Sequence, residues 1–326
     1  MRRRRAPGLA LAALLALSPA LAACGGSSEP ATPPPGPSTA AAPPSAPGTA
    51  APSASPTGAT DQLYVSVGDS YAAGYQASGP GVGSTTTNGF AYQVVDDAKA
   101  KGYDLRLTNF GCGGATTTSI LQDPGCRPDL LGPGATAYQG QTQAEAAEAF
   151  LRENRGRVDL LTVSIGGNDV TNCVDAEDTV ACVTTAVASI GSNLDRLLER
   201  LRAAAGPQTR IVGITYPDVI LGELLSSDPE QRKTANLSVI AFKSLINPAL
   251  KAAYEKVDGT FVDVTEATGG YGSLEELTDL APYGRVPVPV AQICKLTYYC
   301  EFRDIHPRTE GYALISALVV DTLPAR

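Results

Sequence analysis

Ser70 is the residue of this sequence that is best placed to act as a nucleophile. It stands in the block VGDSY at residues 67–71, directly after an apolar segment that predicts a β-strand. A serine hydroxyl is inert at neutral pH unless a base accepts its proton and hydrogen-bond donors stabilise the oxyanion that forms. The tripeptide Gly-Asp-Ser is also common in turns, so the chemistry depends on what the rest of the chain supplies.

His306 is the only histidine in the chain and therefore the only imidazole that can activate Ser70. A lone histidine in an exported domain is more often a surface or core residue than a catalyst. Its lack of companions excludes a histidine-based zinc site. We expect a metal-independent reaction without a cofactor, provided that the six cysteines beyond Cys24 are disulfide-bonded.

Two glycine-rich segments follow the next two predicted strands. The block GCGGAT occupies residues 111–116, and IGGND occupies residues 165–169. The ordinary interpretation of such segments is a flexible loop for the first and an asparagine that caps a helix for the second. Because parallel strands end at one edge of the sheet, where such folds bind ligands, we expect Ser70, Gly114 and Asn168 to converge.

The pattern beyond residue 60 alternates strand and helix, which is typical of a parallel sheet covered by helices. We predict strands at residues 63–67, 105–109, 159–165, 210–215 and 260–264. We predict helices at residues 90–101, 141–154, 187–205, 234–256 and 311–322, and a kink in the fourth helix at Pro248.

The blocks around Ser70, Gly114, Asn168 and His306, in this order, resemble the SGNH (GDSL-type) hydrolases, which include secreted actinobacterial esterases and lipases. The resemblance covers the chain from about residue 61 to the end. It implies an α/β fold, a three-layer α/β/α sandwich with a five-stranded parallel, flavodoxin-like sheet. It also implies that the N–H groups of Ser70 and Gly114 and the side-chain amide of Asn168 form an oxyanion hole. The alternative serine-hydrolase signature, Gly-x-Ser-x-Gly, is absent.

Two positions depart from the pattern of that family. Tyr71 replaces the usual leucine after the serine, at a position that we expect to pack rather than react. Arg303 stands three residues before His306, where relatives usually carry an aspartate, and Asp304 is only two residues before it. We favour Asp304 as the acid that orients the imidazole. The alternatives are the main-chain carbonyl of Arg303 in that role and Asp304 as a cap of the following helix.

The amino terminus predicts export. Arginines at positions 2–5 and an apolar run at residues 9–21 are typical of a signal peptide, which we assign to residues 1–23. The block LAAC at residues 21–24 resembles a bacterial lipobox, in which a lipid on Cys24 anchors the protein to the extracytoplasmic face of the cell membrane. Cleavage after Ala22 and secretion is the alternative. Residues 24–60, rich in Pro, Ala, Ser and Thr, predict an extended tether to a hydrolase domain at residues 61–326.

The chain has seven cysteines, and the odd count is explained if Cys24 is lipidated and the other six pair. The simplest pairing joins sequence neighbours, since the export route is oxidising: Cys112 with Cys126, Cys173 with Cys182, and Cys294 with Cys300. Each loop closed in this way adjoins a predicted site residue.

The formal net charge of −8 argues against a nucleic-acid partner. We expect a monomer that hydrolyses an ester of a lipid, a small molecule or a glycan. Esterase or lipase is the leading prediction, phospholipase and carbohydrate O-deacetylase are alternatives on the same site, and a non-catalytic lipid- or glycan-binding lipoprotein is the rival. Two segments either line an acyl pocket or form local core. They are residues 216–221 and the irregular region 271–302, with Tyr283, Tyr298 and Tyr299.

Overall fold

The structure is a computed structural model that describes residues 62–173 and 176–326. The predicted signal peptide, the lipobox with Cys24, the tether and Asp61 lie outside the described residues. Within the described ranges, no helix is both long enough and apolar enough to cross a membrane.

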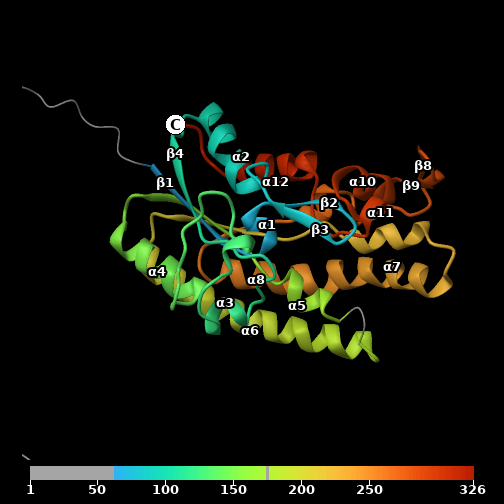
Figure 1. Cartoon of the computed structure of the whole chain (residues 1–326), viewed down its shortest axis with the longest axis horizontal. Helices are drawn as coiled ribbons and strands as arrows, with labels where there is room; N and C mark the ends of the chain where they lie inside the picture. The colour runs from blue at the N-terminus through green and yellow to red at the C-terminus, as the bar shows by residue number, and fades with distance from the viewer. Residues whose placement is uncertain (1–61, 174–175) are drawn as a thin grey trace, which may run out of the picture. The chain divides into compact units, whose positions relative to one another are not determined.

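The centre of the domain is a five-stranded parallel sheet with the order β4-β1-β5-β6-β7 (Figure 1). The strands are β1 (Gln62–Gly68), β4 (Leu105–Asn109), β5 (Val158–Ser164), β6 (Arg210–Ile214) and β7 (Thr260–Val262). The predicted strands and the flavodoxin-like order are confirmed. The last strand ends earlier than predicted, because Asp263 accepts a hydrogen bond from Glu266 N and begins helix α9 (Val264–Ala267).

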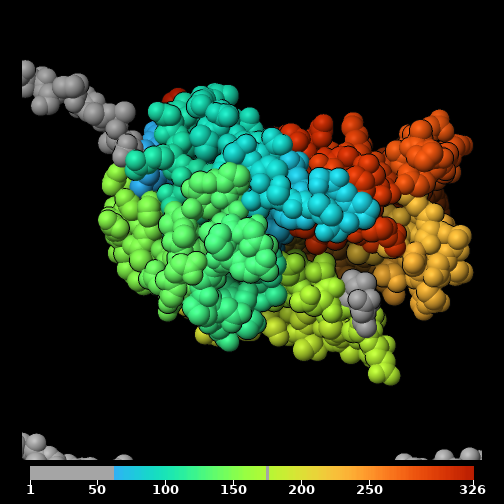
Figure 2. Space-filling model, viewed as in Figure 1, coloured from blue at the N-terminus to red at the C-terminus, as the bar shows by residue number. Residues whose placement is uncertain are grey.

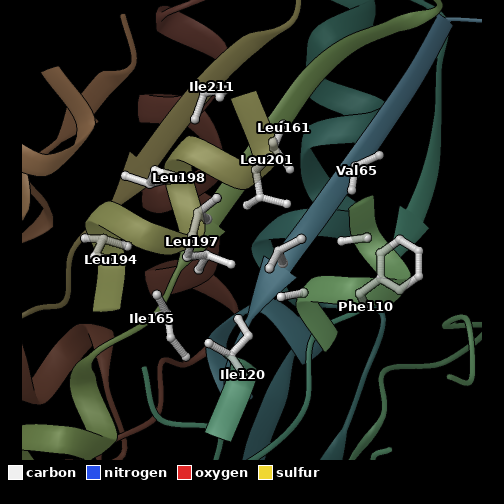
Figure 3. Close-up of a cluster of buried hydrophobic side chains, with 14 of the residues drawn as sticks. Val65, Phe110, Ile120, Leu161, Ile165, Leu194, Leu197, Leu198, Leu201 and Ile211 are labelled. Atoms are coloured by element: carbon white, nitrogen blue, oxygen red, sulfur yellow. The ribbon is translucent and has the colours of Figure 1, made fainter. Parts of the chain in front are cut away.

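Helices cover both faces of the sheet, which confirms the three-layer α/β/α architecture. One face packs against α4 (Gln143–Glu153), α6 (Thr179–Ala205) and α8 (Asn247–Glu255), and the other packs against α2 (Phe90–Asp97) and α12 (Thr309–Asp321). Figure 3 shows leucines of α6, among them Leu197 and Leu201, beside Val65 and Leu161 of the central strands. The removal of these side chains from water stabilises the layers.

Two helices differ from their predicted bounds. The first turns of α6 precede the predicted start at residue 187 and are mostly exposed, so that no apolar stripe marks them. The helix predicted at residues 234–256 consists of α7 (Pro229–Ala241) and α8, joined by a π-helical turn, η4 (Phe242–Ile246). This turn directly precedes the predicted kink at Pro248, a residue that has no N–H to donate within a helix.

The prediction of an irregular region at residues 271–302 was wrong. The region contains a hairpin, β8 (Leu277–Leu280) with β9 (Gly284–Pro287), and helices α10 (Val288–Leu296) and α11 (Tyr299–Phe302). Together with η3 (Val219–Leu225) and α7, these elements enclose a hydrophobic cluster separate from the two sheet faces. Hairpin strands this short carry no regular apolar alternation, and the hairpin β2 (Tyr75–Gly79) with β3 (Val82–Thr85) was missed for the same reason.

The remaining short helices lie in the connections of the sheet. They are α1 (Ser70–Ala73), η1 (Ala98–Lys101), α3 (Ser119–Gln122), η2 (Pro128–Leu130) and α5 (Gly167–Thr171). Helices α1 and α5 begin directly after β1 and β5, so that their first residues lie at the carboxyl edge of the sheet.

Candidate active site

Ser70 is the first residue of α1 and follows the carboxyl end of β1. Gly68 makes the turn possible, because its φ is +148° and a Cβ atom there would lie 2.1 Å from the carbonyl oxygen of Ser164. The Ser70 residue is 6% exposed. As the first residue of a helix, it has a backbone N–H without an acceptor inside the helix. The turn therefore presents a hydroxyl and a backbone donor at the same edge.

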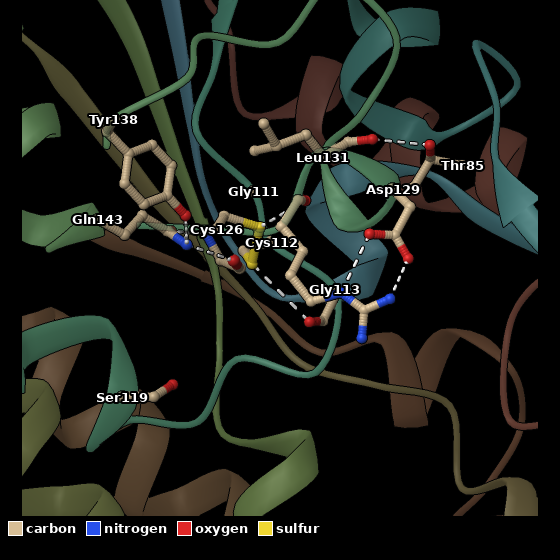
Figure 4. The surroundings of a disulfide bond; sticks show 12 residues. Thr85, Gly111, Cys112, Gly113, Ser119, Cys126, Asp129, Leu131, Tyr138 and Gln143 are labelled. Atoms are coloured by element: carbon tan, nitrogen blue, oxygen red, sulfur yellow. Dashed lines mark hydrogen bonds and ion pairs between the residues drawn. A yellow bond between two sulfur atoms is a disulfide. The ribbon is translucent and has the colours of Figure 1, made fainter. Parts of the chain in front are cut away.

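Two amide side chains hold this turn. Gln143 accepts a hydrogen bond from Gly68 N at 2.7 Å and donates one to Gly68 O at 3.0 Å. Figure 4 shows Gln143 beside Tyr138, whose hydroxyl lies 3.3 Å from Gln143 Nε2. Asn109, the last residue of β4, donates to Ala72 O at 2.8 Å. Neither role could be predicted from the sequence, because contacts between distant segments leave no local pattern.

Asp69 ties the start of α1 to the segment after β6. Its buried carboxylate accepts hydrogen bonds from Tyr71 N at 3.0 Å and from the Tyr216 hydroxyl at 2.6 Å. Burial raises the pKa of Asp69 to about 7, and the two hydrogen bonds offset only part of that effect. From the sequence alone, Asp69 was predicted only as a turn residue.

His306 reaches Ser70 from the loop between α11 and α12. Its Nε2 lies 2.8 Å from Ser70 Oγ, and its Nδ1 lies 2.8 Å from Asp304 Oδ1. Burial raises the pKa of Asp304, but its hydrogen bonds and electrostatic interaction with His306 outweigh burial and bring it below its ordinary value. Asp304 is therefore ionised at neutral pH and accepts from Nδ1–H, which leaves Nε2 free to accept from the Ser70 hydroxyl.

The structure distinguishes between the three interpretations of the segment before His306. Asp304 Oδ1 contacts both His306 Nδ1 and His306 N, the latter at 2.9 Å. The partners of the His306 ring nitrogens within the described residues are Asp304 Oδ1 and Ser70 Oγ, and the Arg303 carbonyl is not among them. Arg303 has φ +59°, and its guanidinium lies 2.6 Å from Glu223 Oε1. Helix α12 begins after Arg308 with no side-chain cap, so the interpretation of Asp304 as a helix cap was wrong. The ring contact thus comes from the Asp304 carboxylate.

Gly114 and Asn168 lie on loops that are hydrogen-bonded to each other. Asn168 Nδ2 donates to Ala115 O at 2.8 Å. Farther along the same two loops, Asp169 accepts from Thr117 Oγ1 at 2.6 Å and from Thr117 N at 2.9 Å. Asn168 is the second residue of α5, so its interpretation as a helix cap was also wrong. Because a primary amide has two N–H groups, Asn168 keeps one further donor.

The backbone around Gly114 leaves one N–H for a ligand. Gly113 N donates to Leu130 O and Ala115 N donates to Cys112 O, whereas Gly114 N has no acceptor within the part of the chain that the structure describes. Gly114 has φ +79°, a conformation that glycine adopts without strain. The space where its side chain would stand is open, with no atom within 4 Å.

Three disulfides join the sequence neighbours as predicted, namely Cys112–Cys126, Cys173–Cys182 and Cys294–Cys300. Figure 4 shows the first of them beside Gly111 and Gly113. The second links the residues after α5 to the first turn of α6, and the third links α10 to α11. Each bridge therefore closes a loop next to a predicted site segment.

The β2–β3 hairpin borders the site. The ring centroid of Tyr75, the first residue of β2, lies 4.3 Å from that of His306. Figure 2 shows the hairpin in cyan at the surface, between the green segments that follow β4 and the red C-terminal helices. Of the residues considered for an acyl pocket, Leu221 and Tyr299 instead belong to the buried cluster around η3.

No group of three or more metal-ligating side chains comes together among residues 62–173 and 176–326. The groups that converge on Ser70 are an imidazole, a carboxylate and N–H donors. In combination they can transfer a proton and stabilise an oxyanion.

The sequence profile described as the GDSL-like lipase/acylhydrolase family matches residues 66–314. Among solved structures, the chain is similar to an extracellular lipase from Streptomyces rimosus, with 18% identity, a TM-score of 0.46, and coverage of 81% of this chain and 100% of that one. It is also similar to a catalytic mutant of an acetylxylan esterase from Geobacillus stearothermophilus, with 17% identity, a TM-score of 0.45, and coverage of 80% and 93%. A carbohydrate acetylesterase from Sinorhizobium meliloti has 12% identity, a TM-score of 0.43, and coverage of 80% and 98%. The comparison with curated protein sequences finds no match.

Proposed function

Because the chain belongs to the GDSL-like lipase/acylhydrolase family and is therefore a hydrolase, we propose that it cleaves carboxylic esters through an acyl-serine intermediate. One observation carries this proposal: His306 lies between Ser70 Oγ and the Asp304 carboxylate, at 2.8 Å from each. This is the arrangement by which a neutral imidazole turns a serine hydroxyl into a nucleophile.

The proposed reaction has two halves. In the first, Ser70 Oγ attacks the ester carbonyl while His306 Nε2 takes the hydroxyl proton, which it then gives to the leaving alkoxide. In the second, water attacks the acyl-serine with His306 again as base, and the acid is released. Asp304 stabilises the imidazolium that forms in each half.

The negative charge on the carbonyl oxygen needs donors that are already in place. The N–H groups of Ser70 and Gly114 and the second N–H of Asn168 are the proposed donors. The hydrogen bond from Asn168 to Ala115 supports this assignment, because it connects the side-chain donor to the residue that follows Gly114.

Hydrolysis of a short-chain chromogenic ester tests the proposal. We expect Ser70→Ala and His306→Ala each to lower kcat by about 10⁴-fold or more, and the double variant to be little worse, because the two residues act as one unit. Ser192→Ala, at an exposed serine of α6, is the matched control. Turnover like that of the wild type in either single variant of a folded protein contradicts the proposal.

We also propose that the protein acts outside the cytoplasmic membrane, anchored through a lipid on Cys24. The basis is the sequence of residues 1–60. Detergent partitioning of the full chain should place the wild type in the detergent phase, and Cys24→Ser in the aqueous phase with its activity intact. A wild-type protein in the aqueous phase contradicts the anchor.

A further inference from the structure

Tyr71 directly follows Ser70, and its side chain reaches the loop that carries His306. The Tyr71 residue is 3% exposed, and its hydroxyl donates a hydrogen bond to Ile305 O at 2.7 Å. The two residues are 234 positions apart in the chain. Ile305 stands between Asp304 and His306, so this contact joins the Ser70 helix to the middle of the Asp304–His306 segment.

The contact fixes one end of a peptide group whose other end is held by Asp304. The Ile305 carbonyl and the His306 N–H belong to the same planar peptide unit. The carbonyl accepts from Tyr71, and the N–H donates to Asp304 Oδ1 at 2.9 Å. The orientation of this plane sets the direction in which the His306 side chain leaves the backbone.

We infer that Tyr71 is a positioning residue, whose hydroxyl fixes the Ile305–His306 peptide so that Asp304, two residues before the histidine, meets Nδ1 while Nε2 meets Ser70. The inference rests on the proposed function of Ser70 and His306. It explains two features of the sequence together, namely the tyrosine in place of leucine after the serine and the aspartate at the shorter spacing.

The surroundings of Tyr71 keep its hydroxyl protonated, so that it can donate a hydrogen bond. Burial, with a further contribution from the charges of Asp69 and Asp304, raises the pKa of Tyr71 well above its ordinary value. The hydroxyl therefore stays protonated at neutral pH. The ring itself packs edge-on against Tyr216, with centroids 4.9 Å apart, so that a phenylalanine at position 71 keeps the packing and loses only the hydrogen bond.

Other contacts hold the residues on either side of this peptide but do not reach its carbonyl. Tyr298 N donates to His306 O at 3.0 Å, and Thr297 pairs with Pro307 in an isolated β-bridge. Arg303 is held through Glu223. Within the described residues, the Tyr71 hydroxyl is the group that holds the Ile305 carbonyl.

The test compares Tyr71→Phe with Tyr254→Phe. Tyr254 is an equally buried tyrosine whose hydroxyl also donates to a backbone carbonyl, but to that of Val163 in β5, at 3.1 Å, and not to the segment that carries His306. We expect Tyr71→Phe to lower kcat by about 5- to 10-fold with little change in KM, the size of one lost hydrogen bond. Tyr254→Phe should keep kcat while it lowers thermal stability to a similar extent.

The single histidine allows a second readout that does not depend on turnover. In a proton NMR spectrum the low-field Nδ1–H signal can come only from His306, and we expect Tyr71→Phe to shift or broaden it, also in a Ser70→Ala background. Tyr254→Phe should leave the signal unchanged. If Tyr71→Phe loses stability as Tyr254→Phe does but keeps both kcat and the Nδ1–H signal, the inference is overturned.

A double-variant cycle with Asp304→Asn completes the test. Because both residues hold the same peptide and ring, Tyr71→Phe should have little further effect on kcat once Asp304 is replaced. Fully additive losses contradict the inference. Failure of the proposed function is distinguishable, since it appears as residual turnover in Ser70→Ala and leaves the NMR comparison intact.

Discussion

Ser70, Gly114 and Asn168 lie in the segments that directly follow three neighbouring parallel strands, whereas Asp304 and His306 lie on a loop between two helices. The first group takes its position from the sheet, because β4, β1 and β5 end at the same edge. The second group takes its position from individual contacts, among them those of Tyr71 with Ile305, of Glu223 with Arg303 and of Tyr298 with His306. We therefore expect single substitutions near His306 to lower activity more than stability.

The two regions also have different cores behind them. Strands β1 and β5 are almost completely buried between the two helical layers. The loop with His306 follows α10 and α11, which pack on the smaller cluster around η3. Because fewer buried groups support this cluster, local opening should start there and move His306 away before the sheet unfolds.

Apart from the substitutions of Ser70 and His306, the largest effect is expected from Asp304→Asn, which tests whether the region around His306 depends on a single carboxylate. The amide should favour the wrong tautomer of His306 and lower kcat by about 10³- to 10⁴-fold without unfolding the protein. Asp279→Asn, at an exposed position of β8, is the control. Near-normal turnover in folded Asp304→Asn would reject the carboxylate and indicate the Arg303 carbonyl.

A smaller effect is expected from Asn168→Ala, in the region that the sheet positions. Loss of an oxyanion donor should lower kcat by about 10²- to 10³-fold. Loss of the hydrogen bond to Ala115 should lower the free energy of unfolding by about 1 kcal/mol. Steady-state kinetics and urea unfolding measure the two effects, with Asn236→Ala on the exposed face of α7 as control. An unchanged kcat removes Asn168 from the oxyanion hole.

The disulfides allow a direct comparison of the two regions. We expect the pair Cys294→Ser and Cys300→Ser to lower kcat by about 10-fold, because small displacements of a catalytic group are costly, and to lower stability as well. The pair Cys173→Ser and Cys182→Ser should lower stability with a smaller loss of kcat. Equal losses of kcat in the two double variants would show that the regions do not differ in this respect.

The smallest effect on activity is expected at Asp218, just before η3 in the core behind the His306 loop, where the prediction concerns stability. Burial raises the pKa of Asp218 to about 7, and the hydrogen bond from Ser238 offsets only part of the shift. Folding thus favours the protonated carboxyl, so the wild type loses stability as the pH rises from about 4 to about 7. An asparagine side chain does not titrate in this range, so the substitution Asp218→Asn removes this loss.

Urea unfolding at pH 5 and pH 8 tests the Asp218 prediction. The free energy of unfolding of Asp218→Asn relative to wild type should rise by roughly 1 to 4 kcal/mol between the two pH values. The difference between the proteins cancels the contribution of all other titrating groups. A difference that is the same at both pH values contradicts the shifted pKa.

The elements that could be predicted are those with strong local patterns. The five strands carry apolar runs, and the C-terminal part of α6 carries a leucine stripe that packs on the sheet. The two hairpins and α10 were missed because their residues are short runs without regular alternation. Gln143, Asn109 and Tyr216 were missed because each acts through a hydrogen bond to a segment far away in the chain.

The sequence by itself determined the sheet and the three segments at its carboxyl edge, because strand patterns are local properties. For the six cysteines beyond Cys24 it offered the pairing of sequence neighbours as the simplest of several, and the structure selected that pairing. Only the tertiary structure decided how Asp304 reaches His306. That contact depends on a left-handed backbone at Arg303 and on a hydroxyl from Tyr71. The physical reason is that a planar peptide can turn either way in an isolated loop, and hydrogen bonds from remote residues select one orientation.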